Sequence, residues 1–142
     1  MVARLTQSER HKEDPMRDLT RNKATVKAFF NLAFNEKQPA EAVAKYVGSE
    51  YIQHNPQAGD GAEAFIQFVT GFVAQFPQLS VDIKRAIAED DLVMTHSHLK
   101  VSPEDRGTAV MDVFRLQDGK IVEHWDVMQP VPETAANDNT MF

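Results

Sequence analysis

Cysteine is absent from the 142 residues of this chain. Disulfide bonds and thiolate metal sites are therefore excluded, and a cytoplasmic location is the expectation for such a sequence. No apolar run approaches the roughly 20 residues that a membrane-spanning helix requires, so no membrane partner is expected. Residues 1–15, MVARLTQSERHKEDP, also lack the apolar core of a signal peptide.

Basic residues are outnumbered: 15 lysines and arginines stand against 21 aspartates and glutamates, which gives a formal net charge of −6. Nucleic acids require a basic face, so a nucleic-acid partner is disfavoured as well. The hydrophobic share of 42% and the charged share of 25% are those of a globular protein, and the length suits one compact domain. We expect residues 1–142 to form a single domain, with a flexible N-terminal segment over 1–16 and a C-terminal tail over 131–142.

Apolar residues recur with helical spacing in the first half of the chain. The first such stripe predicts a helix from residue 17 to 36. Residues 39–48 are typical of a second, short helix with Pro39 in its first turn and Gly48 as its stop. A third stripe predicts a helix that ends at Pro77. The apolar positions of the first and third helices are Val26, Phe29, Phe30, Ala33 and Phe34, and Phe65, Phe68, Val69, Phe72, Val73 and Phe76.

The apolar period then changes to two, which is typical of strands. Strands are predicted around 81–87, 90–101, 107–116 and 120–129, and the segment QDG before the last of them is a strong turn signal. The segment EYIQHNP, residues 50–56, predicts an earlier short strand. Three helices, one early strand and a four-strand antiparallel meander together indicate an α+β fold.

The segments YIQHNP and FRLQDGKIVEHWDV, in this order of elements, resemble the SnoaL-like polyketide cyclases of the nuclear transport factor 2-like superfamily. The resemblance covers residues 17–130. It implies a cone-shaped barrel, in which a curved, mostly antiparallel sheet wraps around three N-terminal helices. It also implies a homodimeric enzyme without a cofactor, which uses an aspartate on the last strand as the acid/base of an intramolecular aldol condensation.

Asp126 corresponds to that aspartate, because it follows the DGKI turn at the family's position. The histidine that the family's cyclases carry on the preceding strand is replaced here by Asp112, and a glutamine two residues earlier is replaced by Val110. The partner that the resemblance implies is a small hydrophobic molecule with a carbonyl group.

The register of the last hairpin decides which side chains share the pocket face. In a tight two-residue turn, Asp112 would stand opposite Trp125. In a three-residue loop with Gly119 in the left-handed conformation, Asp112 would stand opposite His124 instead. We favour the longer loop because it separates polar from apolar side chains. It places Asp112, His124 and Asp126 on one face, and Met111, Val113 and Trp125 on the other.

His96 and His98 lie two residues apart in a predicted strand, so their side chains share one face. We expect them to face the polar pocket, with the solvent-exposed face of the sheet as the open alternative. Deprotonation next to a carbonyl needs a carboxylate base and hydrogen-bond donors at the enolate oxygen. The candidate base is Asp126, and a neutral Asp112 would be one donor, because burial beside a second carboxylate raises the pKa of an aspartate. The predicted catalytic set is Asp126, Asp112, His96, His98 and His124, with a purely structural pairing of His124 and Asp112 left open.

The side chains expected to bind the substrate come from helices and strands alike. They are His54, Tyr51, Phe30, Phe34, Phe68, Met94 and Phe114.

Two alternatives remain open beside this interpretation. One is a metal site, in which histidine and carboxylate ligands would suit zinc, iron or nickel. The other is a non-catalytic, ligand-binding dimer of the same fold. The alternative metal set is His54, His96, His98 and Asp126.

Two further expectations concern the surface. Trp125 and Met111 are expected on the open face of the sheet, where they would form the dimer interface. The apolar pair Met141 and Phe142 follows a polar run and is expected to dock on the body of the protein or on a neighbouring subunit. A frayed end is the alternative for this pair.

Overall fold

The computed structural model describes residues 15–142. Most of the segment that we expected to be flexible lies outside these residues. Helix α2 (Pro15–Phe30) begins at the first described residue and continues into the short π-helical segment η1 (Asn31–Asn35). The first predicted helix is therefore confirmed.

The second and third predicted helices are also present, as α3 (Pro39–Tyr46) and α4 (Ala62–Gln75). Pro39 begins α3 as predicted, since its fixed φ suits the first helical position. The helix ends before Gly48, which belongs instead to strand β1 (Val47–Gln53). A Cβ on Gly48 would lie 3.0 Å from Cγ1 of Val122 on the neighbouring strand. Gly48 thus lies where two strands approach closely, and a larger residue would require the Val122 side chain to shift.

The strands form one sheet, in the order β1-β5-β4-β3-β2. Strand β1 pairs with β5 in parallel, and the other neighbours pair antiparallel. The predicted α+β fold of the nuclear transport factor 2-like type is confirmed. The sheet curls without closing, because β1 and β2 form its two edges, so the cone is an open one. The remaining strands are β2 (Ser80–Glu89), β3 (Leu92–Lys100), β4 (Thr108–Gln117) and β5 (Lys120–Pro130).

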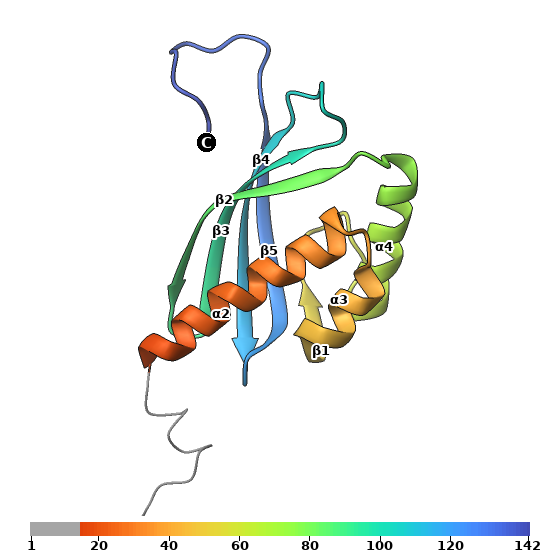
Figure 1. The fold of residues 1–142 in the computed structure, drawn as a ribbon, viewed down its shortest axis with the longest axis vertical. Helices are drawn as coiled ribbons and strands as arrows, with labels where there is room; N and C mark the ends of the chain where they lie inside the picture. Colours follow the sequence, from red (N-terminus) through yellow and green to blue (C-terminus); the bar gives the residue numbers. More distant parts are fainter. Residues whose placement is uncertain (1–14) are drawn as a thin grey trace, which may run out of the picture.

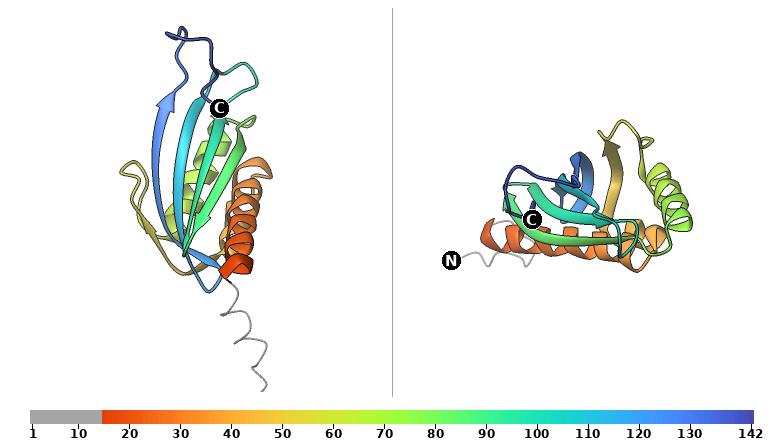
Figure 2. Two further views of the ribbon diagram at one scale, coloured as in Figure 1. Left: turned by 90° about the vertical axis from the view of Figure 1, so that its left-hand side faces the viewer. Right: turned by 90° about the horizontal axis from the view of Figure 1, so that it is seen from above.

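The helices lie on the inner side of the curled sheet (Figures 1 and 2). Helix α2 contacts β2, β3 and β5, while α4 contacts β1 and α3. The right-hand view of Figure 2 shows α2 running beneath the sheet and α4 beyond β1. Among the helices of residues 15–142, none is both long and apolar enough to cross a membrane.

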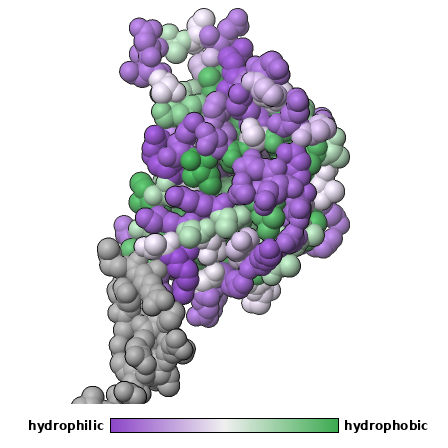
Figure 3. Space-filling view, in the orientation of Figure 1, coloured by the Kyte–Doolittle hydropathy of each residue, from purple (hydrophilic) through white to green (hydrophobic). Residues whose placement is uncertain are grey.

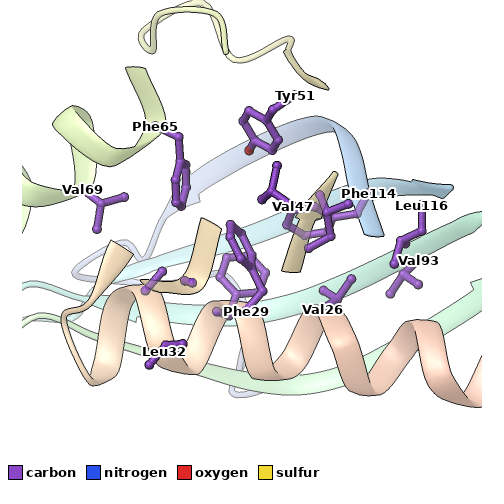
Figure 4. Packing of buried hydrophobic residues seen from close by; sticks show 14 of the residues in the cluster. Val26, Phe29, Leu32, Val47, Tyr51, Phe65, Val69, Val93, Phe114 and Leu116 are labelled. Atoms are coloured by element: carbon purple, nitrogen blue, oxygen red, sulfur yellow. The ribbon is translucent and has the colours of Figure 1, made fainter. Parts of the chain in front are cut away.

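Aromatic side chains fill the space between the sheet and the helices (Figure 4). The ring of Phe29 on α2 lies 5.1 Å from that of Phe65 on α4 and 6.2 Å from that of Phe114 on β4. Strands β3 and β4 alternate between buried and more exposed residues, as the period of two predicts. The side of the molecule seen in Figure 3 is largely hydrophilic and is interrupted by small apolar patches.

The hairpin between β4 and β5 combines a tight turn with a bulge. Asp118 and Gly119 have φ values of 51° and 78°, which a two-residue turn of type I′ requires. Gln117 pairs with Lys120 across this turn. The predicted three-residue loop is therefore wrong. The pairing then skips Val122, which is the extra residue of a β-bulge.

The bulge restores the separation of faces that the longer loop was predicted to produce. Asp112 stands directly opposite Asp126, and Phe114 stands opposite His124. A one-residue shift of register exchanges the two faces of a strand, so the bulge undoes what the tight turn alone would have done. Both aspartates and His124 consequently share the inner face, while Trp125 lies on the outer one.

Candidate active site

Polar side chains form two neighbouring rows on the inner face of the sheet. Strand pairing places Thr95, Asp112 and Asp126 side by side on β3, β4 and β5. Gln53 on β1 and His124 on β5 pair in the next row. Asp112 is 4% exposed and His124 7% exposed, and the Asp126 side chain is 8% exposed. Two carboxylates and an imidazole are thus buried together, and such burial is costly unless the groups have polar partners.

The imidazole of His124 lies between two oxygen atoms. Its Nε2 is 2.7 Å from Oδ1 of Asp112, and its Nδ1 is 2.7 Å from Oε1 of Gln53. Oδ2 of Asp126 is 3.9 Å from Nε2, which is too far for a hydrogen bond. The ring of Tyr51 stacks on the imidazole, with 6.3 Å between the centroids and 12° between the planes. These contacts hold the imidazole in one orientation.

Asp126 receives its hydrogen bonds from Asn55. Nδ2 of Asn55 lies 3.0 Å from each oxygen of the Asp126 carboxylate. Oδ1 of Asn55 accepts a hydrogen bond from the backbone N–H of Gln57 at 2.8 Å. That backbone donor fixes which end of the amide faces the carboxylate, because only the NH₂ group can donate. Donation to both oxygens fixes the direction of the Asp126 carboxyl group.

The environment favours the neutral form of Asp112. Burial raises the pKa of Asp112 above its ordinary value of 3.8, and the nearby Asp126 carboxylate adds to this rise, while the hydrogen bond and the charge of His124 oppose it. Burial, followed by the charges of the two aspartates, also raises the pKa of Tyr51. The site therefore combines a carboxyl group whose pKa is raised with a second carboxyl group that is held by the amide of Asn55.

These polar groups line a cavity of about 420 Å³. Five of the predicted substrate-binding residues line it as well, among them Phe68, which is 44% exposed. Phenylalanine rings from both long helices make the wall apolar. The five predicted residues are Phe30, Phe34, Tyr51, Phe68 and Phe114, and the others include Phe29, Phe65, Phe72, Ser97, Leu99, Val110, Thr108 and Met128.

Met94, His96 and His98 lie outside this cavity, so their predicted place in the pocket is wrong. Thr95 and Ser97 are the buried residues between them, and alternation along β3 sends the side chains of the other three to the outer face. The alternative of an exposed sheet face is the one that the structure supports for both histidines.

The C-terminal residues cover part of that outer face. The ring of Phe142 stacks on His98 with 3.9 Å between the centroids, and it lies 5.7 Å from the ring of His96. Met141 borders a shallow groove together with Met111 and Val127. The predicted docking of the C-terminal pair on the body of the protein is confirmed.

His54 also lies away from the cavity, contrary to the prediction. Its ring stacks on Trp125 with 4.7 Å between the centroids and 3° between the planes. Its Nε2 is 2.8 Å from Oε2 of Glu123, whose other oxygen is 2.7 Å from Nε of Arg115. His54 thus belongs to an outer polar cluster, because it stands one residue out of phase with Gln53 and Asn55.

The alternative metal set of His54, His96, His98 and Asp126 does not come together, because the three histidines lie on the outer face of the sheet and Asp126 lies on the inner one. The described residues bring a different set together: Asp112, His124 and Asp126 each place one possible ligand atom within 4.8 Å of the others. The direct 2.7 Å contact between His124 and Asp112 already provides each with a partner.

Sequence analysis missed Gln53 and Asn55 as site residues. A usable signal was present, because alternation along YIQHNP places Tyr51, Gln53 and Asn55 on the same face. Tyr51 was expected in the pocket. Gln53 and Asn55, two and four residues further along the strand, should therefore have been expected there too.

Comparison with known proteins shows the family of this chain. The sequence model of the SnoaL-like domain matches residues 26–124. The chain belongs to the SnoaL-like family. No curated protein matches its sequence.

Solved structures share the fold of this SnoaL-like chain at low sequence identity. A candidate SnoaL-like polyketide cyclase from Jannaschia sp. CCS1 is 21% identical with a TM-score of 0.66, over 82% of this chain and 90% of the other. A candidate polyketide cyclase from Bacillus cereus ATCC 10987 is 19% identical with a TM-score of 0.66, over 87% and 78%. An LEH-like epoxide hydrolase from M. tuberculosis is 22% identical with a TM-score of 0.62, over 79% and 85%.

The free energy of unfolding of Asp112→Asn, relative to that of the parent, is expected to rise with pH. The pKa of Asp112 is raised in the folded protein. The contribution of Asp112 to stability is therefore complete at a pH below its ordinary pKa in the unfolded chain, and is lost as the pH rises through its pKa in the folded protein. Asparagine does not titrate. Urea unfolding at about pH 4 and about pH 7 should show the free energy of unfolding of Asp112→Asn rising relative to that of the parent.

Asp118→Asn, at the exposed turn, is the matched control for this measurement. A difference between Asp112→Asn and the parent that stays constant or falls between the two pH values would contradict the raised pKa of Asp112.

Proposed function

We propose that this protein is an enzyme that removes a proton next to the carbonyl group of a small hydrophobic ketone, in a cyclase- or isomerase-type reaction. The observation that carries the proposal is the position of Asp126. Its carboxylate is held by Asn55, lines an apolar cavity and lies beside the pair formed by Asp112 and His124. A carboxylate base beside a neutral hydrogen-bond donor is the arrangement that enolate chemistry requires.

The roles follow from the environment of each carboxyl group. Asp126 accepts the proton from the carbon atom, and the two hydrogen bonds from Asn55 orient its carboxylate for this step. Asp112, whose pKa is raised, donates a hydrogen bond or a proton to the oxygen on which the enolate charge develops. In an isomerisation, protonated Asp126 then returns its proton to a different carbon atom of the enolate. In an aldol reaction, the enolate carbon first attacks a second carbonyl carbon of the substrate, and protonated Asp126 gives its proton to the alkoxide oxygen that this attack forms.

The cavity favours an uncharged substrate. Its described lining residues include two aspartates and one histidine but no lysine or arginine. A carboxylate or phosphate on the ligand would face the Asp126 charge without a counter-ion, and an unpaired buried charge is costly. A volume of about 420 Å³ lies in the range of small-molecule sites. The substrate class that fits is a neutral, mainly apolar ketone with one or two rings.

Exchange of the hydrogen next to the carbonyl with solvent deuterium tests this function directly. Neutral cyclic ketones that fit the cavity are incubated with the protein in D₂O, and the loss of that proton signal is followed by NMR. Protein-dependent exchange is expected for neutral ketones and not for their carboxylate analogues. If no neutral ketone of suitable size shows protein-dependent exchange, the result would count against enolate chemistry.

Hydration of an epoxide is a second candidate, which the fold shared with an LEH-like epoxide hydrolase favours. A base that activates water and an acid that protonates the epoxide oxygen are needed, and Asp126 and Asp112 could take these roles. Diol formation from a neutral cyclic epoxide, with oxygen-18 taken up from labelled water, would separate this activity from enolate chemistry.

The outer face of the sheet is proposed as a homodimer interface, as the sequence led us to expect. Val127 is 69% exposed and Met94 38% exposed, and Val127 stands opposite Met111 on this face. The 16.0 kDa chain is expected to sediment at twice its mass at micromolar concentration, and Val127→Glu should shift it toward the monomer, because a charge would be buried in the interface. A monomeric parent under these conditions contradicts the proposal.

A further inference from the structure

The amide oxygen of Gln53 accepts two hydrogen bonds. The backbone N–H of Asn55 points at Oε1 of Gln53 over 3.0 Å, and Nδ1 of His124 lies 2.7 Å from the same atom. The backbone group can only donate, so the atom that faces it must be the amide oxygen rather than the amide nitrogen. Because the amide is fixed in this way, Nδ1 of His124 must carry a proton.

This assignment leaves two states for the other ring nitrogen: a protonated Nε2 that donates to an ionised Asp112, or a bare Nε2 that accepts from a protonated Asp112. Nε2 of His124 faces Oδ1 of Asp112 at 2.7 Å. In a neutral imidazole with its proton on Nδ1, Nε2 has a lone pair and accepts a hydrogen bond. The short contact then requires a proton on the Asp112 carboxyl group, because two acceptors would repel each other at this distance. The raised pKa of Asp112 agrees with that state.

We propose that Gln53 is a positioning residue, which holds the proton of a neutral His124 on Nδ1 and thereby keeps Asp112 in its protonated, hydrogen-bond-donating form. Gln53 acts through His124 and lies on β1, at the opposite side of the imidazole from Asp112. Without this acceptor, the ring would place its proton on Nε2, where Asp112 and Asp126 both offer oxygens. Asp112 would then be an ionised acceptor and could no longer serve as an acid.

The assignment of the tautomer stands on the contacts alone, whereas the role of Asp112 as an acid rests on the proposed function. The experiment therefore reads the tautomer without substrate. The protein is labelled with ¹⁵N-histidine, and long-range ¹H–¹⁵N correlation spectra are recorded between about pH 7 and pH 8. The signals of His124 are assigned by their loss in His124→Asn.

The expected spectrum of the parent shows a neutral His124 ring with a protonated Nδ1 and a bare Nε2. Gln53→Glu keeps an oxygen acceptor at this place and should keep the proton on Nδ1. Gln53→Leu removes the acceptor and should move the proton to Nε2. Gln57→Leu, the same substitution at another glutamine of the cavity, should leave the His124 signals unchanged, because the contact of Gln57 in this network comes from its backbone.

Two results would overturn the proposal. One is a parent in which Nδ1 is bare or in which the ring is an imidazolium over this pH range. The other is a Gln53→Leu variant with the tautomer of the parent. If a substrate is in hand, Gln53→Leu should lower kcat by about tenfold or more with little change in KM. An unchanged kcat together with a shifted tautomer would leave the positioning of the proton intact and count against the role of Asp112 as the acid.

Discussion

Replacing Asp126 with asparagine is expected to lower kcat by roughly 10²- to 10⁴-fold, which is the range that general acid/base groups contribute. Asparagine has nearly the same size, and its side-chain oxygen can still accept a hydrogen bond from Asn55, so the fold should persist. The amide cannot take a proton from carbon at neutral pH. Deuterium exchange of a neutral ketone, followed by NMR for parent and variant, measures the effect.

Asp118→Asn is the matched control for this loss, because Asp118 lies at the exposed turn that precedes β5. The Asp118→Asn variant should catalyse deuterium exchange of the ketone at the rate of the parent. The rate–pH profile of Asp126→Asn should also lack the limb that reports ionisation of the base. An Asp126→Asn variant as active as the parent would remove the proposed mechanism, and would leave ligand binding without catalysis as the function of the cavity.

Replacing Phe29 with alanine is expected to reduce the free energy of unfolding by about 3–5 kcal/mol, the usual cost of removing a buried phenylalanine ring. Phe29 is 1% exposed. Its ring contacts those of Phe65 on α4 and Phe114 on β4, so it connects both long helices to the sheet. Folded domains are stable by roughly 5–15 kcal/mol, so a large part of this stability would be lost. Urea unfolding measures the change.

Phe68→Ala provides the comparison, because Phe68 is 44% exposed and lines the same cavity. About half of its transfer free energy is at stake, so a loss of about 1 kcal/mol is expected. Equal losses for the two variants would show that the cavity wall, rather than the contact between helices and sheet, limits stability. That result would contradict the role assigned to Phe29.

The kind and order of the elements follow from the sequence because the period of apolar residues is a local property. The stripe around Phe29 requires a helix, and the alternation around Phe114 requires a strand. The DGKI turn and YIQHNP were sufficient for the family, and the position of Asp126 after that turn was sufficient to single it out. Its place on the same face as Asp112 depends on the bulge at Val122.

The choice of face for His96 and His98 was decided only by the tertiary structure. Alternation shows that the two histidines share a face, but it does not show which face packs against the helices. The inner face of β3 carries the smaller Thr95 and Ser97, which are fully buried against the aromatic core. Both faces of β3 carry polar side chains, so the sequence pattern alone does not show which face packs inward.

The register of the last hairpin and the partners of the site were also beyond the sequence. The tight turn and the bulge each shift the strand pairing by one residue. The bulge lies at Val122, and no distinctive residue type in the sequence indicates it. Asn55 reaches Asp126, and Gln53 reaches His124, across 71 positions of the chain in both cases. The sequence by itself determined the fold, the family and the central aspartate, because these depend on local period and motif. Only the tertiary structure brought β1 beside β5, and with it the two amides that orient the carboxylate and the imidazole.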